Sequence, residues 1–185
     1  MKKIVSVLFV TVMCCVMIVG CSGNNNVPKL PHNNDISLTD SQENIIKKDE
    51  LKELTPDNNA YEYLSQISPD YENSEEYGKQ YVKDENSTVT IEGYEFYMSY
   101  VLNSDNGLMS VRYRGSNIDS SGYDELSNVL IDNYGEPIKN AEFAFYDKYK
   151  EWKVEIDNEE YIVEMGIPTN FQDELWIQIG RNTKK

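Results

Sequence analysis

The sequence has very few of the residues that carry most enzyme chemistry. It contains one histidine, His32, and three cysteines, two of which lie in an apolar N-terminal run. It has no Gly-x-Ser-x-Gly elbow, phosphate-binding loop or dinucleotide-binding glycine pattern. His32 follows Pro31 in a polar stretch that we expect to be unfolded, which argues against a catalytic triad, a histidine zinc site or a histidine general base. We therefore predict no catalytic residues, no metal ligands and no cofactor.

The longest apolar run lies at the N-terminus. Lys2 and Lys3 precede an uncharged, mainly apolar stretch, residues 4–19, and the chain becomes polar directly after Gly20 and Cys21. A cationic start, an apolar centre and a small residue at the cut are typical of a secretory signal peptide. The alternative is an uncleaved membrane anchor. It is less favoured because the run is just shorter than the roughly 17–25 residues of a spanning helix and no basic cluster follows it.

The order Ile18, Val19, Gly20, Cys21 resembles the lipobox of bacterial lipoproteins. The resemblance implies that Cys21 receives a diacylglycerol, that residues 1–20 are removed, and that the protein is held at the extracytoplasmic face of the cell membrane. Two acyl chains hold a protein stably on a bilayer, whereas one holds it only marginally. An acylated Cys21 would leave the mature chain without a free thiol for a disulfide, a zinc site or a nucleophile.

The chain is strongly acidic. Its formal net charge is −15, and removal of residues 1–20 takes away two lysines and no acid, which leaves −17. Nucleic acid is therefore an unfavourable partner, since phosphate binding needs a basic surface. A cationic ligand, an envelope protein or a glycan fits this charge better, although acidity also serves simply to keep an exported protein soluble.

The polar composition after Cys21 predicts a flexible tether over 21–59, because too few apolar residues are present to offset the entropy of ordering. One short helix beginning at Asp40 or Ser41 interrupts this tether. Residues 60–86 are a lead-in that contains a short helix ending before Pro69. The folded domain is expected over 87–180 and a polar, frayed tail over 181–185.

From Thr88 onward, apolar and polar residues alternate, which predicts β-strands. The alternating segments are 88–91, 94–102, 108–115, 142–146, 152–156, 161–165 and 174–179.

Two-residue turns at 92–93, 106–107 and 158–159 are expected to join these strands into hairpins. They predict a register in which apolar side chains face each other across every pair. The predicted pairs are Ile91 with Tyr94, Val89 with Phe96, Leu102 with Val111, Tyr100 with Tyr113, Ile156 with Tyr161, Val154 with Val163 and Trp152 with Met165.

One helix separates the third and fourth strands. An apolar stripe from Tyr123 to Tyr134 recurs at helical spacing, with Ser120 or Ser121 as the expected cap and acidic residues in the first turn. Gly135 is expected to end the helix.

These elements predict an α+β fold of order β-β-β-α-β-β-β-β, an antiparallel sheet with one helix packed on one face. It resembles the small α+β domains behind lipid anchors in Gram-positive surface lipoproteins. The chain also has a helix end at 133–137 and then a strand that opens with Trp152. This order is similar to that of the beta-lactamase-inhibitor-like and outer-membrane-assembly lipoprotein folds. Those folds repeat a helical pair before their strands, and this chain does not. Such likeness of architecture does not carry function across.

Four residues are expected on the face of the sheet that the helix leaves open. Tyr97 and Trp176 point away from the apolar set of their strands, and Arg112 and Arg114 are expected opposite Val101 and Ser99. Exposed aromatics beside arginines predict a binding patch for a glycan or a protein, and the alternative is ordinary cross-strand pairing.

The sequence thus favours a lipid-anchored, non-enzymatic binding module of the cell envelope. Two alternatives stay open. One is an accessory hydrolase of wall or glycan that uses a pair of acidic residues, for which Glu151, Glu155, Glu160 and Glu164 lie on or beside one hairpin. The other is an immunity or inhibitor protein that blocks another secreted protein.

Overall fold

In the computed structural model of the chain, residues 27–55, 77–83, 87–143, 145–170 and 173–182 are described. Their elements, in chain order, are β1 (Lys29–Leu30), β2 (Asn33–Ser37), α1 (Gln42–Asp49), β3 (Lys52–Glu53), β4 (Lys79–Val82), β5 (Thr88–Ile91), β6 (Tyr94–Asn103), β7 (Gly107–Ser116), α3 (Ser120–Tyr134), β8 (Lys139–Phe143), β9 (Tyr146–Ile156), β10 (Glu159–Pro168) and β11 (Glu174–Arg181).

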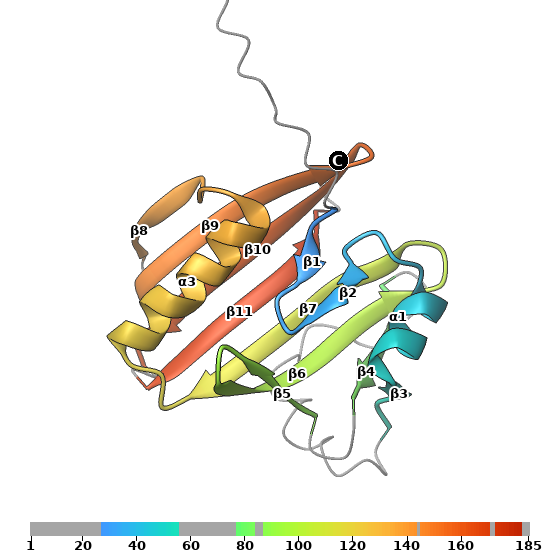
Figure 1. Cartoon of the computed structure of the whole chain (residues 1–185), viewed down its shortest axis with the longest axis horizontal. Coiled ribbons are helices and arrows are strands. Elements are labelled where there is room, and N and C mark those ends of the chain that lie inside the picture. Colours follow the sequence, from blue (N-terminus) through green and yellow to red (C-terminus); the bar gives the residue numbers. More distant parts are fainter. Residues whose placement is uncertain (1–26, 56–76, 84–86, 144, 171–172, 183–185) are drawn as a thin grey trace, which may run out of the picture.

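Nine strands form one antiparallel sheet (Figure 1). The spatial order is β3-β4-β6-β7-β11-β10-β9-β8, and β5 pairs with β6 on the edge that β4 also uses. The α+β class and the antiparallel sheet predicted from the sequence are confirmed. The final strand, β11, returns to the middle of the sheet between β7 and β10, so it joins the two hairpins into one surface.

The N-terminal segment corrects the predicted tether. Within 27–55 the chain forms a two-stranded hairpin, β1–β2, and helix α1, which the side chain of Ser41 caps as one of the two predicted cap residues. Both elements lie on the same face of the sheet as α3 (Figure 1). Their apolar side chains enter the common core, and four of them, Leu30, Ile36, Leu38 and Ile45, are completely buried. The apolar residues of this segment are few, but most of them are buried in the core, which the composition alone does not reveal.

The ends of the predicted domain also shift. β4 lies within the predicted lead-in, yet it pairs with β6 and buries Tyr81 and Val82. The short helix predicted before Pro69 falls outside the described residues. At the other end, Arg181 belongs to β11 rather than to a frayed tail. Its guanidinium donates to the Asn106 side chain at 3.1 Å and forms an ion pair with Glu159.

The register is confirmed at one predicted turn. Across the 92–93 turn, Ile91 pairs with Tyr94 and Val89 with Phe96, as the sequence predicts.

The β6–β7 register is two residues from the prediction. Tyr100 pairs with Val111 and Met98 with Tyr113. The loop is longer than two residues because the Asn103 side chain accepts hydrogen bonds from the amides of Asp105 and Asn106. Gly107, at φ 68°, then opens β7.

The β9–β10 hairpin differs in the same way. Val154 pairs with Tyr161 and Trp152 with Val163. The turn residues are Asp157 and Asn158, both at positive φ, which is the requirement of a type I′ turn. In both hairpins the error is two residues, so each side chain keeps its predicted face. The β8–β9 boundary also lies earlier than predicted, because β9 already begins at Tyr146.

Helix α3 covers the β9–β10–β11 part of the sheet (Figure 1). Its cap is Asp119, whose carboxylate accepts from the amides of Ser121 and Gly122, and not the predicted Ser120 or Ser121. The predicted acidic first turn is therefore absent, since Asp124 and Glu125 lie beyond it. Gly135 ends the helix as predicted, and the buried Trp152 indole donates to the Gly135 carbonyl oxygen at 2.8 Å. This bond fixes the helix end to the sheet.

The sheet thus has two different faces. We call the face under α3, α1 and the β1–β2 hairpin the inner face, and the opposite one the outer face.

Candidate functional site

The outer face gathers all four residues that the sequence singled out as a patch. Tyr97 on β6 pairs with Arg114 on β7, and Arg114 pairs with Trp176 on β11. Arg112 lies on the same face, opposite Ser99 and Gln178. The predicted partners of the two arginines, Ser99 and Val101, are wrong by two residues, and the observed register brings Arg114 directly beside Tyr97.

Glu174 holds the centre of this patch. The Arg114 guanidinium donates from Nε and Nη2 to both oxygens of Glu174, at 2.7 and 2.5 Å, and lies 5.5 Å from the centre of the Trp176 ring. The Trp176 indole donates to the same carboxylate at 3.0 Å. Burial favours the neutral form of Glu174, but the hydrogen bonds from Arg114 and Trp176 outweigh it and lower the pKa of this carboxyl. A planar guanidinium, an indole and a carboxylate are thereby held rigid before any ligand arrives.

The patch continues along the sheet as a row of planar side chains. Trp176 pairs with Gly166 on β10, and Gly166 pairs with Tyr149 on β9. Gly166 has no side chain to fill the gap, and the Tyr146 ring occupies it, only 2.5 Å from where a Cβ atom would lie. The rings of Tyr146 and Tyr149 are 5.3 Å apart. We call Tyr97, Arg114, Trp176, Tyr146 and Tyr149 the aromatic row.

A second row, of polar side chains, runs parallel to the aromatic row. We call it the polar row, and the strand register places in it, one after another, Ser99, Arg112, Gln178, Glu164, Glu151 and Lys139. Arg112 donates to Gln178 at 3.1 Å, and Lys139 lies 3.9 Å from Glu151. At about 4.8 Å between neighbouring strands, the aromatic row extends for about 19 Å from β6 to β9, and the polar row for about 24 Å from β6 to β8.

Tyr149 links the two rows. Its hydroxyl lies 2.7 Å from Glu151 Oε2 and 2.7 Å from Glu164 Oε1. Burial, together with these two carboxylates, raises the pKa of Tyr149 far above its ordinary value. The two carboxylate oxygens are therefore at most about 5.4 Å apart, as twice the hydroxyl distance. The acidic residues form two separate pairs, because Glu155 lies opposite Glu160 and not beside Glu164.

Sequence reasoning found the exposed half of this surface and missed the rest. Tyr97 and Trp176 are recognisable because they break the alternation of their strands. Glu174 and Gln178 follow the same alternation on β11 and were recoverable from it. Tyr146 could not be predicted from the alternation, because a register shift next to Pro168 turns its side chain onto the outer face.

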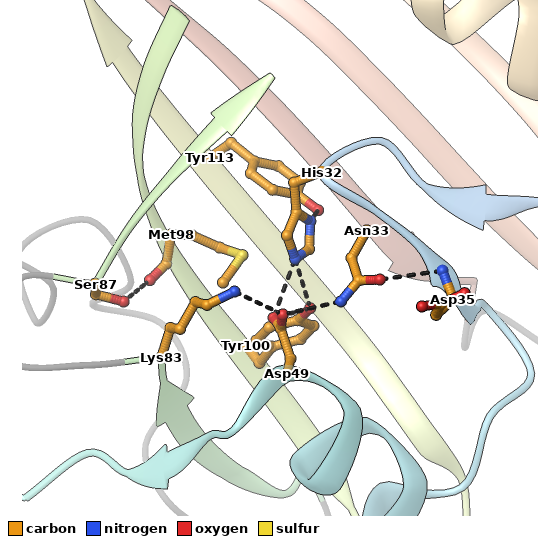
Figure 2. A network of polar contacts seen from close by, with 9 residues as sticks. All are labelled: His32, Asn33, Asp35, Asp49, Lys83, Ser87, Met98, Tyr100 and Tyr113. Carbon is orange, nitrogen blue, oxygen red and sulfur yellow. Dashed lines mark hydrogen bonds and ion pairs between the residues drawn. The ribbon is translucent and has the colours of Figure 1, made fainter. Parts of the chain in front are cut away.

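A second polar cluster lies inside the molecule, around His32 and Asp49 (Figure 2). The prediction that His32 lies in an unfolded tether is wrong. Its side chain is 2% exposed, and its Nε2 and Nδ1 atoms lie 3.0 Å from Asp49 Oδ2 and 2.8 Å from the Tyr113 hydroxyl. A histidine is therefore present in the fold, and its exclusion as a general base cannot rest on its position in the chain.

Asp49 accepts from three further groups, the Asn33 amide at 3.2 Å, the Tyr100 hydroxyl at 2.9 Å and the Lys83 ammonium at 3.1 Å (Figure 2). Burial favours the protonated acid, but the hydrogen bond and charge of His32, with the bonds from Asn33 and Tyr100, outweigh it and hold the pKa of Asp49 well below its usual range.

The inner cluster is a buried hydrogen-bond network that stabilises the fold, and not an open binding site. Both ring nitrogens of His32 are engaged, Nε2 with Asp49 and Nδ1 with the Tyr113 hydroxyl. Tyr100 and Tyr113 are 0% and 1% exposed, and burial raises the pKa of both well above its ordinary value. The cluster joins α1 and the β1–β2 hairpin to β6 and β7.

The lipobox residues Lys2, Lys3, Ile18, Val19, Gly20 and Cys21 lie outside the described residues, so their predicted roles stay predictions. None of the helices in the described part of the chain has the length and apolar character to cross a membrane.

No protein family model, no curated protein and no solved structure matches the chain.

Proposed function

We propose that the protein is a lipid-anchored, non-enzymatic binding module on the extracytoplasmic side of the cell membrane. Its binding surface is the outer face of the sheet, and its ligand is a glycan chain of the envelope. The lipobox supports the location. The observation that carries the binding surface is the alignment of Tyr97, Arg114 and Trp176 across three adjacent strands, continued by the partly exposed ring of Tyr146, which lies beside the buried Tyr149.

A glycan suits this surface better than the other partners that the composition allows. The sugar ring has an apolar face, which packs on an aromatic ring, and a rim of hydroxyl and amide groups, which hydrogen bonds with planar polar side chains. Tyr97 is exposed and Trp176 and Tyr146 are partly exposed, so these three rings offer the first kind of group, whereas Tyr149 is only 5% exposed. The polar row beside them offers the second kind. The rows cross five and six neighbouring strands and are about 19 and 24 Å long, which suits an extended chain better than a compact ligand.

With the proposed anchor at Cys21, the folded N-terminal segment limits how far the domain can stand from the membrane. Because residues 27–55 belong to the domain, only the stretch 22–26 separates Cys21 from the first described residue. Fully extended, this stretch reaches about 20 Å. The anchored domain therefore binds glycan close to the bilayer, and not at the far end of a long tether.

Binding is tested by retention on chitin, an insoluble β-linked polymer of N-acetylglucosamine, and on purified cell wall. We expect retention of the wild type and its loss in the double variant Tyr97→Ala/Trp176→Ala. Tyr77→Ala is the matched control, because Tyr77 is 51% exposed and lies near the opposite end of β6. Equal retention of all three proteins contradicts the proposed surface.

The anchor is tested separately. Radiolabelled palmitate is expected to enter the wild-type protein and not Cys21→Ser, which should be released from the membrane fraction. Recovery of the unlabelled wild type from cytosol, with residues 1–20 intact, contradicts the location.

One observation supports a second function, an accessory glycan hydrolase. The Tyr149 hydroxyl lies 2.7 Å from one oxygen of Glu151 and 2.7 Å from one oxygen of Glu164, so these two oxygens are at most about 5.4 Å apart. Retaining glycosidases hold their two carboxyl groups about 5–5.5 Å apart. Release of soluble sugar from purified wall by the wild type, but not by Glu151→Gln or Glu164→Gln, would favour this function. Chitin binding without sugar release favours the binding module.

A further inference from the structure

A hollow of about 330 Å³ lies on the inner side of the sheet, between the start of α3 and the β8–β9 edge. It is lined by Tyr123 and Asp124 of α3, Asn140 of β8, and Asp147, Lys148, Tyr149 and Lys150 of β9. Its volume is at the lower end of the range of small-molecule sites, roughly 300–1,000 Å³. It shares Tyr149 with the end of the aromatic row, whereas Tyr97, Arg114 and Trp176 do not line it.

Two ammonium groups meet in this hollow. The Nζ atoms of Lys148 and Lys150 lie 4.8 and 5.7 Å from the centre of the Tyr123 ring. Lys150 also donates to the Ser127 hydroxyl at 2.5 Å. Among the described residues, neither ammonium forms an ion pair, whereas Lys139 and Lys153 on the outer face both reach a carboxylate. Two like charges held by one ring favour an anionic group between them.

Two carboxylates face the same hollow. Asp124 and Asp147 are exposed and have no ion pair with a described residue. The charge of Asp124 adds to burial in raising the pKa of Tyr123. A simple anion is therefore disfavoured twice, by these two acids and by the net charge of −15. A simple cation is disfavoured by the two lysines.

We infer that this hollow binds a small zwitterion, an α-amino acid or a dipeptide. Its carboxylate lies against the Lys148 and Lys150 ammonium groups, and its ammonium group lies towards Asp124 and Asp147. The Tyr123 ring packs against its carbon skeleton, and the Asn140 amide bonds its peptide group. A zwitterion has no net charge, so the acidic protein does not repel it.

The test is an NMR titration of the full chain, purified in detergent, with L-alanyl-L-alanine as the probe. We expect saturable shifts of the amide signals of Tyr123, Lys148 and Lys150. N-acetyl-L-alanine lacks the ammonium group and L-alaninamide lacks the carboxylate, so each should bind at least about tenfold more weakly.

Variants locate the binding. Lys148→Gln and the double variant Asp124→Asn/Asp147→Asn should each weaken it by at least about tenfold. Neither change removes a hydrogen bond between described residues, and a melting curve checks that each variant stays folded. Lys153→Gln, on the outer face of the same strand, should bind as the wild type does.

The inference is overturned if the dipeptide gives no saturable shift. It is also overturned if N-acetyl-L-alanine binds as tightly as the dipeptide, or if the Lys148 and aspartate variants keep wild-type affinity.

Discussion

His32 Nε2 lies 3.0 Å from Asp49 Oδ2, which fixes the residue between β1 and β2 to the last residue of α1. Tyr100 and Tyr113, from the middle of the sheet, bond the same pair. A segment with the composition of a linker is thereby made part of the core.

The Asp49 carboxylate should be the most sensitive polar group of the fold. Its side chain is completely buried and accepts from four residues, so Asp49→Asn places an amide donor against donors. We expect a loss of about 3 kcal/mol in the free energy of unfolding, measured with urea. Asp35→Asn, at an exposed position of β2, should change stability by less than about 0.5 kcal/mol. Equal effects of the two substitutions would show that the network contributes no stability.

The same residue predicts an acid-sensitive stability. The pKa of Asp49 is lower in the folded state than in the unfolded chain, so the unfolded chain takes up the proton first as the pH falls. The stability from this carboxylate is complete above about pH 5 and is lost progressively below about pH 4. Urea unfolding across this range should show the difference between wild type and Asp49→Asn shrinking as the pH falls. A difference that is constant with pH would contradict the shifted pKa.

Deletion of residues 21–55 distinguishes a tether from a folded part. The deletion removes Leu30, Ile36, Leu38 and Ile45 and uncovers Tyr100 and Tyr113. We expect loss of cooperative thermal unfolding, because the cost of removing even one such core side chain is about 2–5 kcal/mol. Removal of residues 1–20 alone is the control and should leave the transition unchanged. An unchanged thermal transition after deletion of residues 21–55 would show that this segment is a tether and not part of the folded domain.

Trp152 should stabilise the end of α3 through one hydrogen bond. Trp152→Phe leaves the Gly135 carbonyl oxygen without its donor and removes part of a completely buried side chain. We expect a loss of about 1–3 kcal/mol in the free energy of unfolding by urea. Trp176→Phe changes the other tryptophan, which lies on the outer face, and should cost clearly less. The reverse order would mean that the outer face, and not the helix end, carries the stability.

The alternation of side chains predicted the strands from Thr88 onward because a half-buried strand exposes one face and buries the other. The register of the hairpins was harder to predict than the strands themselves. The hydrogen bonds that the Asn103 side chain accepts and the positive φ of Asp157 place two turns at other residues than predicted. The resulting register errors are two residues each, so the paired side chains keep their predicted faces of the sheet.

The N-terminal segment was misjudged for a different reason. The His32 and Asp49 side chains are buried by partners that are far away in the sequence, since 68 positions separate His32 from Tyr100 and 81 separate it from Tyr113. Polar residues that satisfy each other inside a fold have the composition of a linker. The outer patch was partly visible, because Tyr97 and Trp176 are aromatic residues at solvent-facing positions.

The two tryptophans allow the most direct test of the glycan-binding surface. In an NMR titration with soluble chitohexaose, an oligomer of N-acetylglucosamine, the Trp176 indole signal reports the outer face and the Trp152 indole signal reports the inner face. We predict a saturable shift of the Trp176 signal with the Trp152 signal unchanged. A Trp176 signal that stays fixed at every sugar concentration would contradict glycan binding at this surface.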